Sequence, residues 1–156
     1  MAEQPKKSVL FICLGNICRS PIAAAVFRHV ARQKGVEHEW KCDSAAIGPW
    51  HVGSTMDKRA AQVLSKHGVD TSHRVRQITK DDFRTFDYVF GMDNENMREL
   101  RKRAPPDAKA KIQLLGSHDP QGKLIIRDPY YDDDIAGFEE CYEIALRSCT
   151  AFLEKF

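Results

Sequence analysis

The chain has 156 residues, of which 42% are hydrophobic, and its 24 basic and 22 acidic residues leave a net charge of +2. This length provides one well-cored domain, residues 1–156, and the near-neutral charge gives no reason to expect nucleic acid or an anionic membrane as a partner. No apolar run approaches the roughly eighteen residues of a membrane span, and residues 1–8 lack the apolar core of a secretory signal. Five cysteines without disulfide-scaffold spacing indicate a reducing compartment, so we expect a cytoplasmic protein.

Segments typical of strands and helices alternate along the chain. In chain order, we predict a strand at 9–13, a helix at 20–34, a strand at 39–44, a helix at 57–67, a strand at 87–92, a short helix at 95–103, a strand at 111–115 and a closing helix at 134–155. The sequence therefore predicts an α/β fold. We expect a single-domain, four-stranded parallel sheet with helices on both faces, a three-layer sandwich of Rossmann-like or flavodoxin-like type.

The turn between the first strand and the first helix reads Cys13-Leu14-Gly15-Asn16-Ile17-Cys18-Arg19-Ser20. Gly15 and Asn16 tolerate positive φ, Ser20 is a good N-cap, and Pro21 suits the first helical position. A turn of this kind directs several backbone N–H groups and the positive end of a helix dipole at one point. Because ligands of parallel sheets bind beyond the carboxyl ends of the strands, we predict a phosphate-binding loop here.

Two side chains of this turn can turn phosphate binding into catalysis. The field that attracts a dianion also favours the thiolate form of a cysteine, so Cys13 is the predicted nucleophile. Arg19 can offer its planar guanidinium to two phosphate oxygens. The alternative is structural: a buried Cys13 that ends a strand beside a helix-capping turn. The pattern favours an enzyme that cleaves phosphate esters through cysteine.

A second Cys-x5-Arg spacing runs from Cys141 to Arg147. It lies in a segment with helical periodicity, in which positions six apart fall on different faces. The two side chains therefore cannot converge on one ligand, and no glycine frees the backbone there. We predict that Cys141 is packed core.

Asp128 is the candidate proton donor, in the loop Arg127-Asp128-Pro129-Tyr130-Tyr131-Asp132-Asp133-Asp134. A phenolate leaving group has a conjugate acid of pKa ~10, and a positioned acid speeds its departure by roughly 10²–10⁴-fold. The adjacent tyrosines offer flat apolar walls for a substrate ring. Alternatively, the acidic run caps the last helix. For Trp50 the sequence supports two interpretations equally: a partly buried core aromatic, or a wall of the pocket.

Cys18 lies five residues from Cys13 in one tight loop, so a reversible disulfide between them is geometrically feasible. Such a bond would protect the nucleophile from over-oxidation. A metal site is the competing interpretation, but the spacing lacks a second pair and no histidine cluster lies nearby. We therefore expect neither a metal nor a cofactor.

The chain resembles the low-molecular-weight protein tyrosine phosphatases. The segment from Val9 to Pro21 is close to the family signature, and further matches run nearly end to end. They are Asp43-Ser44-Ala45-Ala46, Arg76-Gln77-Ile78-Thr79, Phe86-Asp87-Tyr88, Met92-Asp93, Leu114-Leu115-Gly116 and Asp128-Pro129-Tyr130-Tyr131.

The resemblance implies a metal-independent hydrolase of protein phosphotyrosine and small aryl phosphates, with inorganic phosphate as product. Cys13 would attack phosphorus, Arg19 would hold the phosphate, and Asp128 would protonate the phenolate and then activate water. The phosphate-binding loop would comprise Leu14, Gly15, Asn16, Ile17, Cys18 and Ser20. A supporting network would comprise Asn16, Ser20, Ser44, His73 and Asp93, and an aromatic rim would comprise Trp50, Tyr130 and Tyr131. The family also implies oxidative pairing of Cys18 with Cys13 and tyrosine kinases acting on Tyr130 and Tyr131.

The chain departs from vertebrate relatives at Ser54-Thr55-Met56-Asp57-Lys58-Arg59, where they usually carry an Asn-Pro-Pro-Asp-Tyr-Arg-like segment. Trp50 and His51 fall in a stretch that varies among isoforms, and Arg127 stands where relatives often have Glu. These changes leave the chemistry intact and the peptide preference open.

Four other functions fit parts of the pattern. Thiol-dependent arsenate reductases need further cysteines after the third helix, and residues 71–103 contain none. Protein-arginine phosphatases of similar sequence carry a small polar residue in place of Ile17, whose larger apolar side chain suits an aromatic ester. A non-catalytic phosphotyrosine-binding module would not need Cys13, Arg19 and Asp128 together. A nucleotide-binding loop would need Gly-Lys-Ser/Thr after the glycine.

Overall fold

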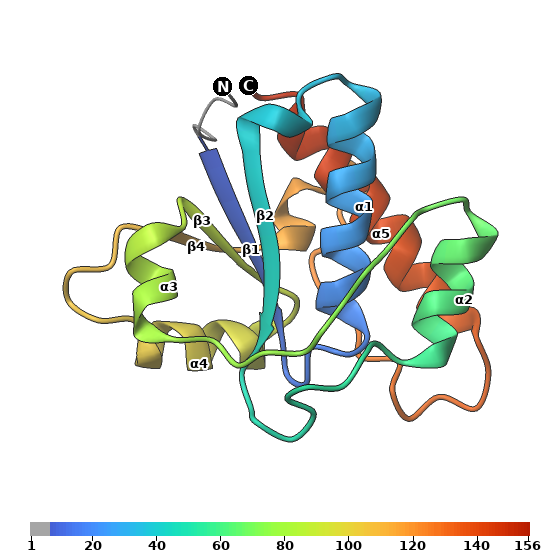
Figure 1. Ribbon diagram of the computed structural model, residues 1–156, viewed down its shortest axis with the longest axis horizontal. Coiled ribbons are helices and arrows are strands. Elements are labelled where there is room, and N and C mark those ends of the chain that lie inside the picture. Colours follow the sequence, from blue (N-terminus) through green and yellow to red (C-terminus); the bar gives the residue numbers. More distant parts are fainter. Residues whose placement is uncertain (1–6) are drawn as a thin grey trace.

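The structure is a computed structural model that describes residues 7–156, built around one parallel sheet (Figure 1). Residues 1–6, part of the segment in which we expected no secretory signal, lie outside the described residues. The four strands are β1 (Lys7–Cys13), β2 (Trp40–Ala46), β3 (Tyr88–Gly91) and β4 (Lys111–Leu114), in the spatial order β2-β1-β3-β4. All three pairings are parallel, which confirms the predicted four-stranded sheet.

Helices cover both faces of the sheet, as predicted. They are α1 (Arg19–Gln33), α2 (Lys58–Lys66), α3 (Lys80–Thr85), α4 (Asn94–Arg103) and α5 (Ala136–Leu153), with short 3₁₀ turns η1 (Glu37–Glu39) and η2 (Leu115–His118). In Figure 1, α1, α2 and α5 lie on one side of the sheet, and α3 and α4 on the other. None of the helices in the described residues is both long and apolar enough to cross a membrane.

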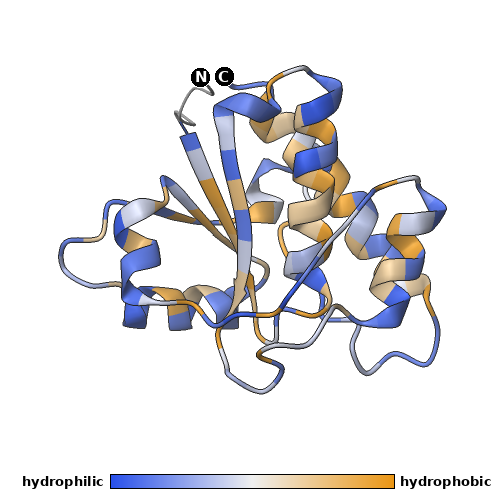
Figure 2. Cartoon of the chain, viewed as in Figure 1, coloured by the Kyte–Doolittle hydropathy of each residue, from blue (hydrophilic) through white to orange (hydrophobic). Residues whose placement is uncertain are grey.

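β1 lies at the centre of the sheet, and both of its faces are buried. Val9 and Phe11 pack into the cluster beneath α1 and α5, whereas Leu10 and Ile12 pack into the cluster beneath α3 and α4. This is the two-residue alternation of a strand, and because helices cover both faces, every position from Val9 to Cys13 is apolar. Figure 2 shows the hydrophobic residues gathered along β1, α1 and α5. The packing fixes the carboxyl end of β1, which Cys13 occupies.

β2 and α3 are the main differences from the sequence prediction, and the ends of the other predicted strands and helices move by at most two residues. β2 continues to Ala46, two residues further than predicted, because it pairs with β1 up to Cys13 opposite Ala46. α3 was not predicted, since it has only six residues and no long periodic stripe. Its signal is a capping box, in which the Thr79 side chain accepts from the Asp82 N–H and Asp82 accepts from the Thr79 N–H.

Candidate active site

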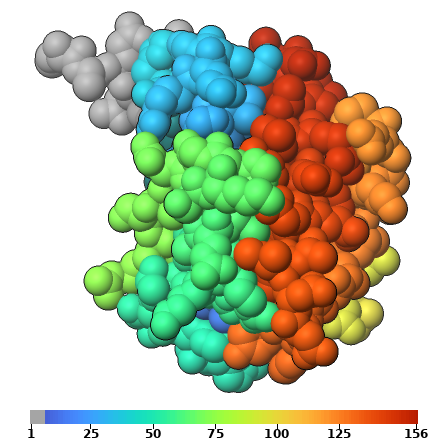
Figure 3. Space-filling view, turned by 90° about the vertical axis from the view of Figure 1, so that its right-hand side faces the viewer, coloured from blue at the N-terminus to red at the C-terminus, as the bar shows by residue number. Residues whose placement is uncertain are grey.

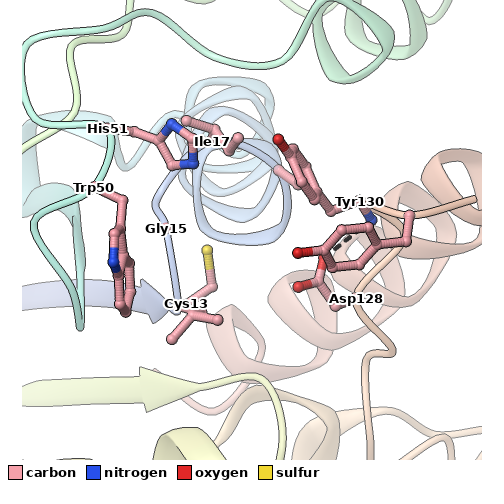
Figure 4. Close-up of a pocket in the computed structure, with 10 residues that line it drawn as sticks. Cys13, Gly15, Ile17, Trp50, His51, Asp128 and Tyr130 are labelled. Carbon is pink, nitrogen blue, oxygen red and sulfur yellow. Dashed lines mark hydrogen bonds between the residues drawn. The ribbon is translucent and has the colours of Figure 1, made fainter.

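The Cys13 sulfur lies at the floor of a cavity formed by the loop that joins β1 to α1 (Figure 4). The Asn16 backbone N–H donates to Sγ at 3.3 Å, and the Ser20 hydroxyl oxygen lies 3.0 Å from Sγ. Ser20 Oγ accepts from the Asn16 side-chain amide at 2.8 Å, so its own hydrogen is free to point at the sulfur. Two donors therefore face one sulfur atom, an arrangement that suits a sulfur acting as hydrogen-bond acceptor.

The backbone of the loop turns at Asn16, whose φ is +58°. Gly15 was also expected to use positive φ, but it does not appear among the glycines with that conformation. Gly15 is instead needed for space, because a Cβ on it would lie 3.0 Å from Cδ2 of His51. The glycine thus lets the wall that carries His51 approach the loop.

Asn16 is fully buried and holds the loop from within. Its amide nitrogen donates to Ser20 Oγ and, at 2.9 Å, to Ser44 Oγ on β2. His73 Nε2 donates to the Asn16 carbonyl oxygen at 2.7 Å, which fixes the ring tautomer. Burial lowers the pKa of His73, although the bond to this carbonyl opposes the shift. The structure therefore brings together four of the five residues of the network that the resemblance implied, namely Asn16, Ser20, Ser44 and His73.

The prediction that Ser20 is the helix N-cap is wrong. α1 begins one residue earlier, at Arg19, with Cys18 in the cap position and no side-chain capping bond. Ser20 lies inside the first turn, where its hydroxyl contacts Cys13 and Asn16 instead. The first-turn N–H groups near this loop are therefore left for another acceptor.

Arg19 is 2% exposed and is held from two sides. Its Nη1 donates to Asp93 Oδ2 at 2.6 Å and to the Ile126 carbonyl at 3.0 Å. Its buried Nε has no hydrogen-bond partner among the described residues. Burial by itself would lower the pKa of Arg19, but the neighbouring Cys13 and the two carboxylates Asp93 and Asp128 raise it. The result is a fixed cation with an unused donor, which suits an anionic ligand.

Asp128 lies across the cavity from Cys13 (Figure 4). Its Oδ1 accepts from the Tyr130 backbone N–H at 3.1 Å, and its Oδ2 lies 3.6 Å from Arg19 Nη2. The acidic residues that follow Asp128 have other partners. Asp134 accepts from the Ala136 N–H at the start of α5, whereas Asp132 pairs with Arg127 at 2.6 Å. Asp134 therefore supplies the carboxylate acceptor at the start of α5, whose N-cap is Ile135, and Asp128 faces the cavity.

The cavity has a volume of about 330 Å³ and an aromatic rim. Trp50 is 66% exposed and Tyr131 is 89% exposed, which places Trp50 on the cavity wall and not in the core. The Tyr130 ring lies 4.9 Å from that of Tyr131 and 6.2 Å from that of His51. The lining residues are Cys13, Leu14, Gly15, Ile17, Cys18, Trp50, His51, Asp128, Tyr130 and Tyr131.

The cysteines are all free thiols. Cys18 lines the cavity, and burial, followed by the charges of Asp57 and Cys13, raises its pKa. Cys141 is buried in α5, as predicted, while Arg147 pairs with Asp119 at 2.9 and 3.0 Å. Within residues 7–156, no group of three His, Cys, Asp or Glu side chains is arranged to hold a metal ion.

Sequence reasoning missed several residues that shape the site. His51 lines the cavity, whereas the sequence analysis noted it only in a stretch that varies among isoforms. Arg76 binds Asp43 and Asp82 with its side chain, and its N–H lies 3.4 Å from Asn16 Oδ1. Arg59 was noted only within a segment that departs from relatives, yet it contacts the loop that carries Asp128.

Known proteins resemble this chain over almost its whole length. The profile of the family described as low molecular weight phosphotyrosine protein phosphatase matches residues 8–156. The chain is 54% identical over 157 aligned positions to the low molecular weight phosphotyrosine protein phosphatase of Sus scrofa, covering 99% of each sequence. The chain belongs to this family. The resemblance found in the sequence is thereby confirmed, and the protein is an enzyme of the low molecular weight class of phosphatases, which are hydrolases.

Solved structures show the same fold. The crystal structure of Primo-1 superposes with a TM-score of 0.92 at 49% identity, covering 96% of this chain and 97% of that one. The crystal structure of a Drosophila protein described as an arginine phosphatase superposes with a TM-score of 0.90 at 41% identity, covering 94% of this chain and 96% of that one. One fold therefore serves relatives named for different phosphorylated residues.

Proposed function

We propose that this enzyme hydrolyses phosphotyrosine in proteins, and small aryl phosphates, through a cysteinyl-phosphate intermediate. One observation carries the proposal. The Cys13 sulfur, with two donors directed at it, shares a cavity with Asp128, and the buried Arg19 beside it has an unused Nε donor. A nucleophile, a cation and an acid are thus within reach of one phosphate.

In the first step, the Cys13 thiolate attacks phosphorus and an S–P bond forms. The P–O bond to the tyrosine ring breaks, its electron pair goes to that oxygen, and protonated Asp128 supplies the proton. The loop amides of Leu14, Gly15, Asn16, Ile17 and Cys18 and the Arg19 guanidinium stabilise the equatorial phosphate oxygens. Because this chain supplies these positive groups itself, we propose that no metal or cofactor is required.

In the second step, Asp128 acts as a base. It takes a proton from water, the water oxygen attacks phosphorus, and the S–P bond breaks with its electron pair returning to sulfur. Inorganic phosphate leaves and Asp128 is protonated again. The Ser20 hydroxyl and the Asn16 N–H stabilise the departing thiolate, and Ser44, His73 and Asp93 hold these groups in place.

Substrate preference follows from the cavity walls. Trp50, Tyr130 and Tyr131 offer flat faces to an aryl ester, and Ile17 presents an apolar side chain to the ring. A guanidinium substrate would instead need a polar partner at that wall. We propose phosphotyrosine over phosphoserine and phosphoarginine. Initial rates on phosphotyrosine, phosphoserine and phosphoarginine, measured with a chelator present, test this. A preference for phosphoarginine, or a requirement for added metal, would overturn the proposal.

The nucleophile is tested by trapping the intermediate. Rapid quenching during turnover of a phosphorus-labelled aryl phosphate is expected to leave label on Cys13. Cys13→Ser is expected to lower turnover by at least about 10⁴-fold while phosphate still binds. Label elsewhere, or near-normal turnover by the variant, would reject the mechanism.

Three further proposals concern regulation and location. Cys18 lines the same cavity as Cys13, which supports a reversible disulfide between them; full recovery of peroxide-treated Cys18→Ala by dithiol would contradict its protective role.

Tyr130 and Tyr131 are exposed, so tyrosine kinases can reach them, and absence of labelling by such a kinase would count against this. A thiol-dependent enzyme with five free cysteines fits the cytoplasm, and fractionation tests that location.

A further inference from the structure

The backbone of Tyr130 connects the proposed acid to a distant part of the chain. Its N–H donates to Asp128 Oδ1 at 3.1 Å, and its carbonyl accepts from Arg59 Nη2 at 2.9 Å. Arg59 lies in the first turn of α2, 71 residues away in sequence. One peptide segment therefore sits between the Asp128 carboxylate and the Arg59 guanidinium.

Arg59 uses four of its five N–H groups in this region. Nε and Nη2 bind the two oxygens of Asp57 at 3.1 and 3.0 Å, a bidentate pairing. Nη1 donates to the Asp132 carbonyl at 2.8 Å, and Nη2 donates to the Tyr130 carbonyl. The guanidinium also lies over the Phe138 ring at 4.5 Å, which limits its movement. The planar guanidinium of Arg59 therefore holds the loop that carries Asp128 at two of its carbonyl groups.

Asp57 joins this arrangement to the phosphate-binding loop. Its backbone N–H donates to the Ile17 carbonyl at 2.8 Å, and its carboxylate caps α2 by accepting from the Arg59 N–H. Burial would raise the pKa of Asp57, but the bonds from Arg59 lower it, so the carboxylate stays charged. In Figure 3 the segment that begins α2 and the segment around residue 130 lie side by side. The path runs from Ile17 through Asp57 and Arg59 to the acid loop.

We propose that Arg59 is a positioning residue that sets the place of Asp128 over the leaving oxygen. The proposal rests on the function proposed above, in which Asp128 is the general acid. No substrate atom needs to contact Arg59, because it acts through the Tyr130 peptide and the Asp132 carbonyl.

The position of Asp128 is a balance between two guanidinium groups. Arg19 Nη2, at 3.6 Å from Asp128 Oδ2, attracts the carboxylate toward the phosphate floor. Arg59 holds the backbone of the same loop through the Tyr130 and Asp132 carbonyls. Without Arg59, the loop keeps the Arg127–Asp132 pair, which is more exposed, and the carboxylate is free to approach Arg19. A displacement near 1 Å costs about 10²-fold in a reaction that depends on alignment.

The first test compares two esters. Arg59→Gln is expected to lower kcat/KM for phenyl phosphate roughly tenfold, since its phenolate needs a proton. For dinitrophenyl phosphate, whose leaving group needs none, the loss is expected to stay below about twofold. Equal losses on both esters would indicate a general disturbance of the site and would overturn the proposal.

The second test is a double-mutant cycle with Asp128→Ala. If Arg59 acts through Asp128, then Arg59→Gln has no further effect on phenyl phosphate in the Asp128→Ala background. Losses that multiply in the double variant would overturn the proposal, because they would show an independent role. The cycle is measured on folded protein, with thermal unfolding curves recorded for each variant.

Two further variants keep the test decisive. Asp57→Asn retains a good N-cap for α2 but removes the charge that orients Arg59, so a weaker loss with the same ester selectivity is expected. It replaces Arg59→Gln if that variant fails to fold. Arg84→Gln is the matched control. Arg84 lies on α3 and its Nε pairs with Asp107 at 2.8 Å, so this variant is expected to leave kcat/KM for both esters unchanged.

The outcomes separate this inference from the function on which it rests. If Asp128→Ala itself affects both esters equally, the acid assignment fails, and the positioning role fails with it. If Asp128→Ala is selective for phenyl phosphate and Arg59→Gln is not, the acid assignment stands and the positioning role alone is rejected.

Discussion

The floor and the rim of the cavity are built by different physical means. On the floor, Cys13, Asn16, Arg19 and Ser20 are buried, and hydrogen bonds connect them to β2, to Asp93 and to the chain around residue 73. On the rim, Trp50 and Tyr131 are mostly exposed, and the Tyr131 ring packs edge-on against that of Tyr130.

This difference separates two tasks. A dianion is bound by donors whose positions are fixed in advance, so the floor needs a closed network with few degrees of freedom. An aromatic ring is bound by area and shape, so the rim needs only flat apolar surfaces near the entrance. Substitutions on the floor should therefore affect both stability and chemistry, and those on the rim should affect mainly the affinity for aryl groups.

The largest effect is expected at Asn16. Asn16→Ala removes the donors to Ser20 and Ser44 and leaves a non-glycine residue without a local polar group at positive φ. We expect the free energy of unfolding to fall by about 2–4 kcal/mol and kcat/KM to fall roughly 10²-fold. Urea unfolding and initial rates measure the two quantities.

Ser44→Ala is the matched control for Asn16→Ala. It removes one of the same hydrogen bonds without changing the loop backbone, and the expected loss is about 1 kcal/mol. If Ser44→Ala were as damaging as Asn16→Ala, the buried amide would not be the centre of the network. If Asn16→Ala kept full activity, the floor would not depend on preorganisation.

Much of the floor could be predicted from sequence, because it is local. Cys13, Asn16 and Arg19 lie within seven residues between an apolar strand and a helix, and the geometry of that turn restricts where their groups can point. The parallel order of the strands also follows from the alternation of elements. Local pattern failed at Ser20, where a hydroxyl suited to capping binds the thiol and the amide instead.

The rest of the site could not be predicted, because it depends on contacts between distant segments. Arg59 meets the carbonyls of Tyr130 and Asp132, and Arg76 meets Asp43 and Asp82; no periodicity in the sequence encodes such pairs. His51 lines the cavity only because Gly15 leaves it room. Short α3 was missed for the opposite reason: its capping box is visible, but six residues carry too little periodicity.

A smaller effect is expected on the rim. Trp50→Ala and Tyr131→Ala are expected to raise KM for an aryl phosphate roughly 3- to 10-fold, because one aromatic contact is worth about 0.5–1.5 kcal/mol. Stability is expected to change by less than about 0.5 kcal/mol, since both side chains are mostly exposed. Inhibition by inorganic phosphate, which has no ring, is expected to stay constant. A large rise in its inhibition constant would mean that the rim also shapes the floor.

The smallest effect concerns pH and the link between His73 and the floor. Burial lowers the pKa of His73, so below about pH 6.5 the unfolded chain takes up a proton that the folded chain resists. The stability associated with the neutral ring is therefore complete above that pH and is lost as the pH falls below it. His73→Gln keeps an N–H donor for the Asn16 carbonyl but does not titrate, so its stability curve is expected to be flatter in this window.

His118 provides the comparison that makes the His73 measurement specific. Burial and the nearby Lys155 also lower its pKa, so His118→Gln flattens the same part of the stability curve. His118 lies in η2; its hydrogen-bond partners are Gln113 and Lys155, and its ring packs against Phe90 and Phe152, not against the Cys13 loop. Both variants should thus change the pH dependence of unfolding, but only His73→Gln should change the pH dependence of kcat/KM. Equal changes in catalysis would mean that His73 supports the fold without tuning the floor.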